Sequence, residues 1–115
     1  MSDDPRAKAA AADELGRLGG PGAREELERL LASGDPRLRA GALSGLRRLG
    51  DPRAIAAIAP LLADEEPIPR ASVESPEGGI VPLRMLAGAV IDELAGEPLE
   101  GDPERVRAWL ASHPG

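Results

Sequence analysis

The stretch that decides the fold is DPRLRAGALSGLRRLG, residues 35–50. Asp35 is a favourable N-cap, and Pro36 stands at the first helical position, where its missing N–H costs nothing. Leucine and alanine then recur at helical spacing, and Gly50 is a typical helix stop. The pattern therefore predicts a helix over residues 36–49.

The same pattern occurs a second time, 31 residues earlier in the chain. Residues 4–19 read DPRAKAAAADELGRLG, and the similarity continues through the residues that follow. Between residues 4–32 and 35–63, 14 of 29 aligned positions are identical. Chance gives only a few identities, so the chain contains an internal repeat. Each copy reads as two helices, because a Gly-Pro or Asp-Pro pair restarts the helical pattern after the first.

One apolar stripe on each helix is expected to face the core. In unit one the stripe consists of Ala7, Ala11, Leu15 and Leu18, then Ala23, Leu27 and Leu31. In unit two it consists of Leu38, Ala42, Leu46 and Leu49, then Ile55, Ile58 and Leu62. Glycines inside these helices are expected to allow close helix approach, at Gly16, Gly41, Gly45 and Gly88.

A third, altered unit follows. Residues 83–94 carry Leu-Arg, Ala, Ile and Leu at the spacing of unit two, and a further Asp-Pro pair at Asp102 begins the partner helix. The residues inserted before this unit contain prolines and a Gly-Gly pair, which bar a helix and predict a long loop or a short hairpin. Helices are therefore predicted at about 5–18, 22–33, 36–49, 52–63, 82–95 and 103–112.

The expected organisation is a single all-α domain over residues 1–115, since about three stacked helix pairs are the minimum that makes a core. The repeats are placed at about 4–34, 35–64 and 82–113, with the inserted loop at 65–81. The predicted architecture is an α-solenoid of three helix pairs.

This pattern resembles the short HEAT-like repeat of the bilin-lyase type. The matching residues are Leu38-Arg39, Ala42, Leu46, Leu49-Gly50-Asp51, Ala54, Leu62 and Asp64. The chain departs from the pattern at Lys8, Gly20 and Gly96, and by the insertion. The resemblance implies an armadillo-like superhelix with the second helices on its concave side, and an Arg39 that ties neighbouring repeats together. Family members are mostly protein-binding scaffolds, whereas a minority act on bilins, bind nucleic acid or neutralise partner toxins.

Composition argues against most catalytic and metal chemistry. The 115 residues include no Cys and a single His, so there is no thiol nucleophile, thiolate zinc site or multi-histidine metal site. One aromatic residue predicts no stacking platform for bases. His113 is expected to be a solvated residue, and no serine stands in a nucleophile elbow. We therefore expect a protein that is not an enzyme and that holds no cofactor or metal.

The chain also lacks the pattern of a membrane or secretory segment. Its N-terminus is acidic, and the longest uncharged stretch, residues 54–63, is too short to span a bilayer. We expect a cytoplasmic protein. The use of 13 Arg against one Lys, with abundant Ala, Gly and Pro, is typical of bacterial proteins from high-GC genomes.

Charge is unevenly distributed within a net charge of -6. Residues 1–63 carry ten basic and nine acidic side chains, whereas residues 64–115 carry four and eleven. A local basic cluster in unit two could bind nucleic acid; it comprises Arg37, Arg39, Arg47, Arg48 and Arg53. The acidic second half and the lack of aromatic residues favour a structural use of these arginines instead.

Two features favour binding to another protein. The second helix of unit two has no charged residue between Arg53 and Asp64, which is unusual for a solvated helix surface. The insertion is longer than a connection in a compact repeat requires. We therefore expect a non-catalytic scaffold, adaptor or immunity-type binder, with a bilin-lyase-like accessory enzyme or a nucleic-acid binder as alternatives. The candidate partner-binding residues are Arg24, Glu28, Ala56, Pro60, Ile68, Arg70 and Val73.

Overall fold

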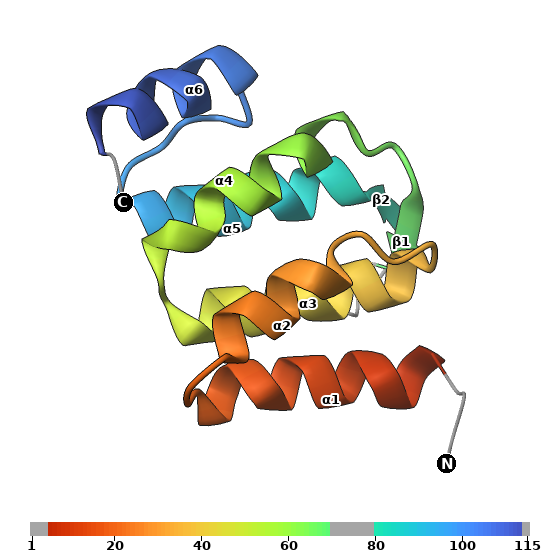
Figure 1. The fold of residues 1–115 in the computed structure, drawn as a ribbon. Helices are drawn as coiled ribbons and strands as arrows, with labels where there is room; N and C mark the ends of the chain where they lie inside the picture. The colour runs from red at the N-terminus through yellow and green to blue at the C-terminus, as the bar shows by residue number, and fades with distance from the viewer. Residues whose placement is uncertain (1–4, 70–79, 114–115) are drawn as a thin grey trace.

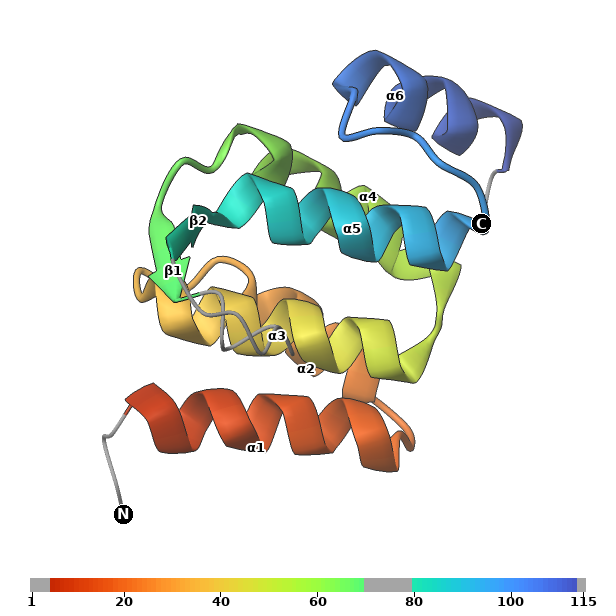
Figure 2. The same cartoon turned by 180° about the vertical axis from the view of Figure 1, so that it is seen from behind.

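The computed structural model describes residues 5–69 and 80–113. The helices are arranged in two layers. The first helices of the three units are α1 (Pro5–Leu18), α3 (Pro36–Leu49) and α5 (Leu83–Ala95). The second helices are α2 (Ala23–Leu30), α4 (Ile55–Ile58) and α6 (Pro103–Ser112). Figure 1 shows α2 and α4 in front of α3 and α5, and Figure 2 shows α1, α3 and α5 stacked from behind. The fold is an all-α solenoid of three helix pairs.

The Asp-Pro pairs set the helix starts, as the sequence predicts. The carboxylates of Asp35, Asp51 and Asp102 each accept a hydrogen bond from the backbone N–H two residues later, at 2.9 to 3.0 Å. Such a side chain satisfies one of the free N–H groups at a helix N-terminus. At the other end, Gly50 and Gly96 adopt left-handed conformations that end α3 and α5.

The second helix of unit two is not the continuous helix predicted over residues 52–63. It consists of the 3₁₀ turn η1 (Pro52–Ala54), the short α4 and the 3₁₀ segment η2 (Ala59–Ala63). Pro60 has no N–H to donate to the carbonyl of Ala56, so the α-helical ladder is interrupted there. A 3₁₀ helix has three residues per turn. The buried side chains accordingly fall at Ile55, Ile58 and Leu61, and the predicted Leu62 is only half-buried.

The apolar stripe predicted for α1 is wrong at three of its four positions, and only Leu15 packs against the core. Ala7 and Ala11 are exposed and Leu18 is 69% exposed, whereas Ala12 is buried. The reason is that α1 is the end helix of the described stack. It packs against α3 and α2, so only the side that faces these helices is covered, and a run of alanines does not reveal which side that is.

Glycines bring α1 and α3 into very close contact. A Cβ atom on Gly16 would lie 1.9 Å from the carbonyl oxygen of Gly45, and one on Gly41 would lie 2.7 Å from the backbone of Ala9. The close approach expected at these glycines is confirmed. Gly88 is different, because a Cβ there would meet its nearest atom, in Gly101, at 3.4 Å.

The insertion begins and ends in a small antiparallel ribbon. Strand β1 (Pro67–Pro69) pairs with β2 (Ile80–Pro82), with Ile68 opposite Val81. These paired arms agree with the predicted hairpin, whose remaining residues, 70–79, lie outside the described part of the chain. Two candidate binding residues, Arg70 and Val73, lie outside the described residues. The ribbon is joined to α5 by hydrogen bonds from the N–H groups of Leu83 and Arg84 to the carbonyl oxygens of Glu66 and Asp64.

The hydrophobic core lies between the two helix layers. Its largest fully buried side chains are Leu27, Leu43, Leu46, Ile55, Ile58, Leu83, Val90, Ile91 and Val106. Within residues 5–69 and 80–113, no helix combines the length and the hydropathy that crossing a bilayer requires.

Candidate functional site

Arg39 has a structural role at the junction of units one and two. Its Nη1 donates to the carbonyl oxygen of Ser33 at 2.6 Å, and its Nε lies 3.0 Å from the carboxylate of Asp64. The Arg39 side chain and the carboxylate are both almost buried. Because Ser33 ends unit one and Asp64 ends unit two, Arg39 ties the repeats together, as the resemblance implies.

Three more arginines of the unit-two cluster pair with carboxylates. Arg48 lies 2.7 Å from Asp13 of α1, and Arg47 lies 3.8 Å from Glu93 of α5. Burial raises the pKa of Asp13, but hydrogen bonds from Ser44 and Arg48 outweigh it and hold the pKa below its usual value. The third pair, between Arg53 and Asp51, belongs to the pocket described next.

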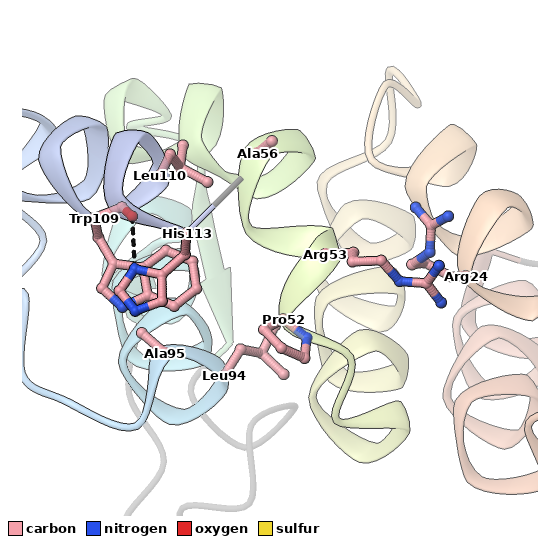
Figure 3. Close-up of a pocket in the computed structure, with 9 residues that line it drawn as sticks. All are labelled: Arg24, Pro52, Arg53, Ala56, Leu94, Ala95, Trp109, Leu110 and His113. Carbon is pink, nitrogen blue, oxygen red and sulfur yellow. Dashed lines mark hydrogen bonds between the residues drawn. The ribbon is translucent and has the colours of Figure 1, made fainter. Parts of the chain in front are cut away.

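A pocket of about 740 Å³ opens between the second helix of unit two and α6. Five elements supply its walls, namely α2, η1, α4, the C-terminal end of α5, and α6 with the residue that follows it. Figure 3 shows stacked rings on one side, guanidinium groups on the other, and Pro52 and Ala56 between them. The lining residues are Arg24, Pro52, Arg53, Ala56, Leu94, Ala95, Trp109, Leu110 and His113.

Trp109 and His113 form an aromatic wall of this pocket. Their ring centroids lie 4.1 Å apart with an interplanar angle of 9°. The imidazole Nδ1 lies 2.9 Å from the carbonyl oxygen of Trp109, a contact that requires the proton on Nδ1. The single Trp therefore takes part in a stacked pair with His113. His113 is exposed, as the sequence predicts, and it also lines the pocket.

On the opposite side, Asp51 holds two guanidinium groups together. Its carboxylate accepts hydrogen bonds from Nε and Nη2 of Arg53, the shorter at 2.7 Å, and lies 3.6 Å from Nε of Arg24. The hydrogen bonds from Arg53 hold the pKa of Asp51 below its usual value, although partial burial opposes them. Arg24 is also held by Glu28 at 2.8 Å and by Glu25 at 3.2 Å.

Two side chains of the pocket carry buried donors without an acceptor. The indole Nε1 of Trp109 and the Nε of Arg24 are buried and make no hydrogen bond within the described part of the chain. An unsatisfied buried donor typically costs about 1–3 kcal/mol. The Nε of Arg24 still lies within ion-pair distance of Asp51, whereas the indole N–H of Trp109 has no partner among the described residues.

The structure brings together only some of the candidate residues. Arg24 and Ala56 line the pocket, Glu28 supports Arg24 from the same helix, and Pro60 is exposed on η2. Ile68 lies in β1, beside the N-terminal end of α5 (Figure 1), whereas the pocket is lined by Leu94 and Ala95 at the C-terminal end of α5. Among the residues that the structure describes, no cluster of acidic residues and histidine could hold a metal ion.

Sequence reasoning missed the aromatic wall and Arg53. One signal was available, because Trp109 and His113 stand four residues apart, the spacing at which helix side chains meet. Arg53 was assigned only to the arginine cluster, since nothing in the sequence places it across from α6.

Comparison with known proteins identifies the repeat class. A scan of protein families matches residues 1–75 to HEAT repeats. Neither the curated proteins nor the solved structures give a match. HEAT repeats generally mediate protein–protein interactions, and the family is typically non-enzymatic. With a match over more than half of its length, on a solenoid of stacked helix pairs, the chain belongs to the HEAT-repeat family.

Proposed function

We propose that this chain is a non-catalytic protein-binding module whose main contact surface is the exposed face of α4 and η2. The observation that carries the proposal is that Ala56, Pro60 and Ala63 are all exposed there and all uncharged. A helix that faces water normally carries charged or polar side chains on its outer face. An exposed apolar strip beside a pocket is typical of a protein docking site.

Polar groups on α2 fit the rim of such a site. Arg24 and Glu28 form an ion pair next to the apolar strip, and both side chains are about one-fifth exposed. Protein interfaces commonly have an apolar centre and a polar rim. In this proposal the pair orients the partner and contributes little to affinity, because each charge is already compensated.

The insertion supplies a second contact in the proposal, through Ile68, Arg70 and Val73. A long excursion from a compact repeat is usually functional. The ribbon and the pocket lie at opposite ends of α5, a helix of 13 residues. At a rise of 1.5 Å per residue they are about 20 Å apart, so a partner that touches both must span the length of that helix.

Capture from a lysate of the source cells tests the proposal. The test variant carries Ala56→Glu and Ala63→Glu; Ala59 is less suitable because it is half-buried and packs on the core. The control variant carries Ala7→Glu and Ala11→Glu, two exposed alanines of α1 that receive the same charges. We expect the wild type and the control to retain one protein at high salt, and the test variant to lose it. Equal capture by both variants, or capture of nucleic acid alone, contradicts the proposal.

A further inference from the structure

We infer that the pocket between η1, α4 and α6 binds a short segment of the partner protein in which a bulky apolar side chain stands beside a carboxylate. This inference rests on the proposed function, since it names the chemistry of the partner that the second-helix face would bind.

The apolar part of the segment is indicated by the pocket lining. Six of the nine lining residues are apolar, namely Pro52, Ala56, Leu94, Ala95, Trp109 and Leu110. A volume of about 740 Å³ is larger than one side chain, so a bulky side chain and part of its backbone fit together. Anchors of this kind, set in apolar pockets, dominate the binding energy of many interfaces.

The carboxylate is indicated by the charges of the lining. The remaining lining residues are Arg24, Arg53 and His113, and none of the nine described lining residues is Asp or Glu. This is notable in a chain with a net charge of -6. Because Arg24 is already compensated by Glu25 and Glu28, the charge complementarity that favours an anionic group on the segment comes from Arg53. The indole N–H of Trp109, which has no acceptor among the described residues, likewise favours a ligand that brings a hydrogen-bond acceptor.

Arg53 is the residue placed to receive this carboxylate. Its side chain is 61% exposed, and within residues 5–69 and 80–113 it is bonded by Asp51 alone, through Nε and Nη2. A guanidinium has five N–H donors, so the two on Nη1 remain for a ligand. Arg24 is less suitable, because it is 22% exposed and already held by Glu25 and Glu28.

The arrangement of the walls limits the form of the segment. In Figure 3 the guanidinium groups and the stacked rings are on opposite sides of Pro52 and Ala56. The apolar anchor and the carboxylate therefore come from neighbouring residues of a chain that crosses the start of α4. A uniformly acidic segment is disfavoured, because the net charge of the whole chain repels it.

Synthetic peptides and the single Trp provide a direct test. The first probe is a capped 12-residue peptide without Trp, in which one Phe is flanked by two Asp. In its first twin Lys replaces both Asp, and in its second twin Ala replaces the Phe. Binding is followed by the fluorescence of Trp109, the only Trp of the chain. We expect the Asp-flanked Phe peptide to bind at least about tenfold more tightly than either twin.

Two matched arginine variants test the role of Arg53. Arg53→Glu places a negative charge at the pocket, and Arg37→Glu makes the same change at the other Asp-Pro-Arg sequence, outside the pocket lining. Both arginines donate their backbone N–H to the carboxylate of the Asp two residues earlier, so both variants keep the same backbone cap. We expect Arg53→Glu to weaken peptide binding by at least about tenfold and Arg37→Glu to change it less than about twofold.

Several results would overturn the inference. These are equal binding of the Asp and Lys peptides, equal binding by the two arginine variants, or no change in Trp109 fluorescence at millimolar peptide. Salt-sensitive binding of a 12-nucleotide oligo-dT that requires Arg53 would point to nucleic acid instead. If cellular capture is lost in the Ala56→Glu and Ala63→Glu variant but kept in Arg53→Glu, the inference fails while the proposed function stands.

Discussion

At the scale of single residues, the glycines between α1 and α3 set how closely the two helices pack. Alanine is the better helix former by about 1 kcal/mol, so propensity alone favours replacing glycine inside a helix. At Gly16, however, a Cβ would lie 1.9 Å from the backbone of Gly45, and backbone cannot move aside as a flexible side chain can. At Gly16 the steric clash of an added Cβ therefore outweighs the gain in helix propensity.

The predicted result is that Gly16→Ala destabilises the fold by about 2 kcal/mol or more, because the two helices must move apart. Gly88→Ala is the control, since its Cβ would meet only an ordinary contact at 3.4 Å. The free energy of unfolding of Gly88→Ala should be unchanged or higher by up to about 1 kcal/mol. Urea unfolding measures both. A stabilised Gly16→Ala protein would mean that α1 and α3 are not in close contact in solution.

Asp13 makes stability depend on pH. Hydrogen bonds from Ser44 and Arg48 outweigh the opposing effect of burial and place its pKa below the ordinary value. A carboxyl with a lowered folded-state pKa stabilises the fold above its unfolded pKa of about 4, and this stabilisation is lost as the pH falls through the folded value.

We predict that Asp13→Asn is less stable than the wild type by about 1 kcal/mol at pH 7. The difference should shrink steadily as the pH is lowered from 4 to 2. Unfolding by urea at each pH measures it, with the exposed Glu104→Gln as control. A difference that stays constant down to pH 2 would show that the Asp13 carboxylate is not the cause.

At the scale of the elements, Arg39 and Asp64 join pieces of the chain that are distant in sequence. Arg39 contacts the carbonyl of Ser33 after α2 and the carboxylate of Asp64 after η2. The carbonyl of Asp64 accepts the N–H of Arg84 in α5, and its side chain accepts the N–H of Glu66. One nearly buried ion pair thus fixes the ends of two second helices and the start of unit three.

Arg39→Ala is therefore expected to cost about 3–5 kcal/mol, because it leaves the carboxylate of Asp64 uncompensated in a nearly buried position. Arg39→Lys should recover only part of this lost stability. A single ammonium group cannot contact both the carbonyl of Ser33 and the carboxylate of Asp64 as the guanidinium group does. Thermal or urea unfolding measures the losses. Arg53→Ala, at an exposed pair, should cost less than about 1 kcal/mol. Similar losses for Arg39→Ala and Arg53→Ala would rule out the joining role.

The helix starts could be predicted because their cause is local. An Asp cap, a Pro at the first turn and a glycine stop act within a few residues, so they can be read without knowing the tertiary structure. The covered side of α1 could not be predicted, because it depends on which neighbours the helix has. The 3₁₀ turns around Pro60 could not be predicted either, because the repeat indicates the same continuous helix as in unit one.

The candidate site was predictable only in its α2 and α4 parts. Arg24 and Ala56 were found because an uncharged helix surface is visible in the sequence. The stacked pair of Trp109 and His113 was missed, although the two residues stand one helical turn apart. Whether such a pair stacks and faces a pocket depends on how α6 is placed, which is decided by the loop between α5 and α6 and by its contacts.

At the scale of the whole molecule, the two ends of the stack are built differently. On α1, the positions equivalent to Gly41 and Gly45 are Ala10 and Glu14, and both are exposed. Without these glycines, no helix can approach the outer side of α1 as closely as α1 approaches α3. At the other end, α6 has one buried residue among ten, Val106, whereas α3 has seven among 14. The backbones of α1 and α3 are therefore in close contact, whereas α6 is held by few buried side chains.

Loose packing at α6 predicts that this helix opens more easily than the rest. Local opening is easiest where few apolar side chains are buried, and in a stack of repeats each unit is held mainly by its neighbours. Hydrogen exchange should show amides of residues 103–112 exchanging through openings of lower free energy than those of residues 36–49. Because Trp109 and Leu110 line the pocket, the Asp-flanked Phe peptide should slow exchange in α6 more than in α3, and Arg53→Glu should reduce that effect. Equal exchange in both helices would mean that α6 unfolds only with the whole solenoid, and its pocket would then be a fixed part of the fold.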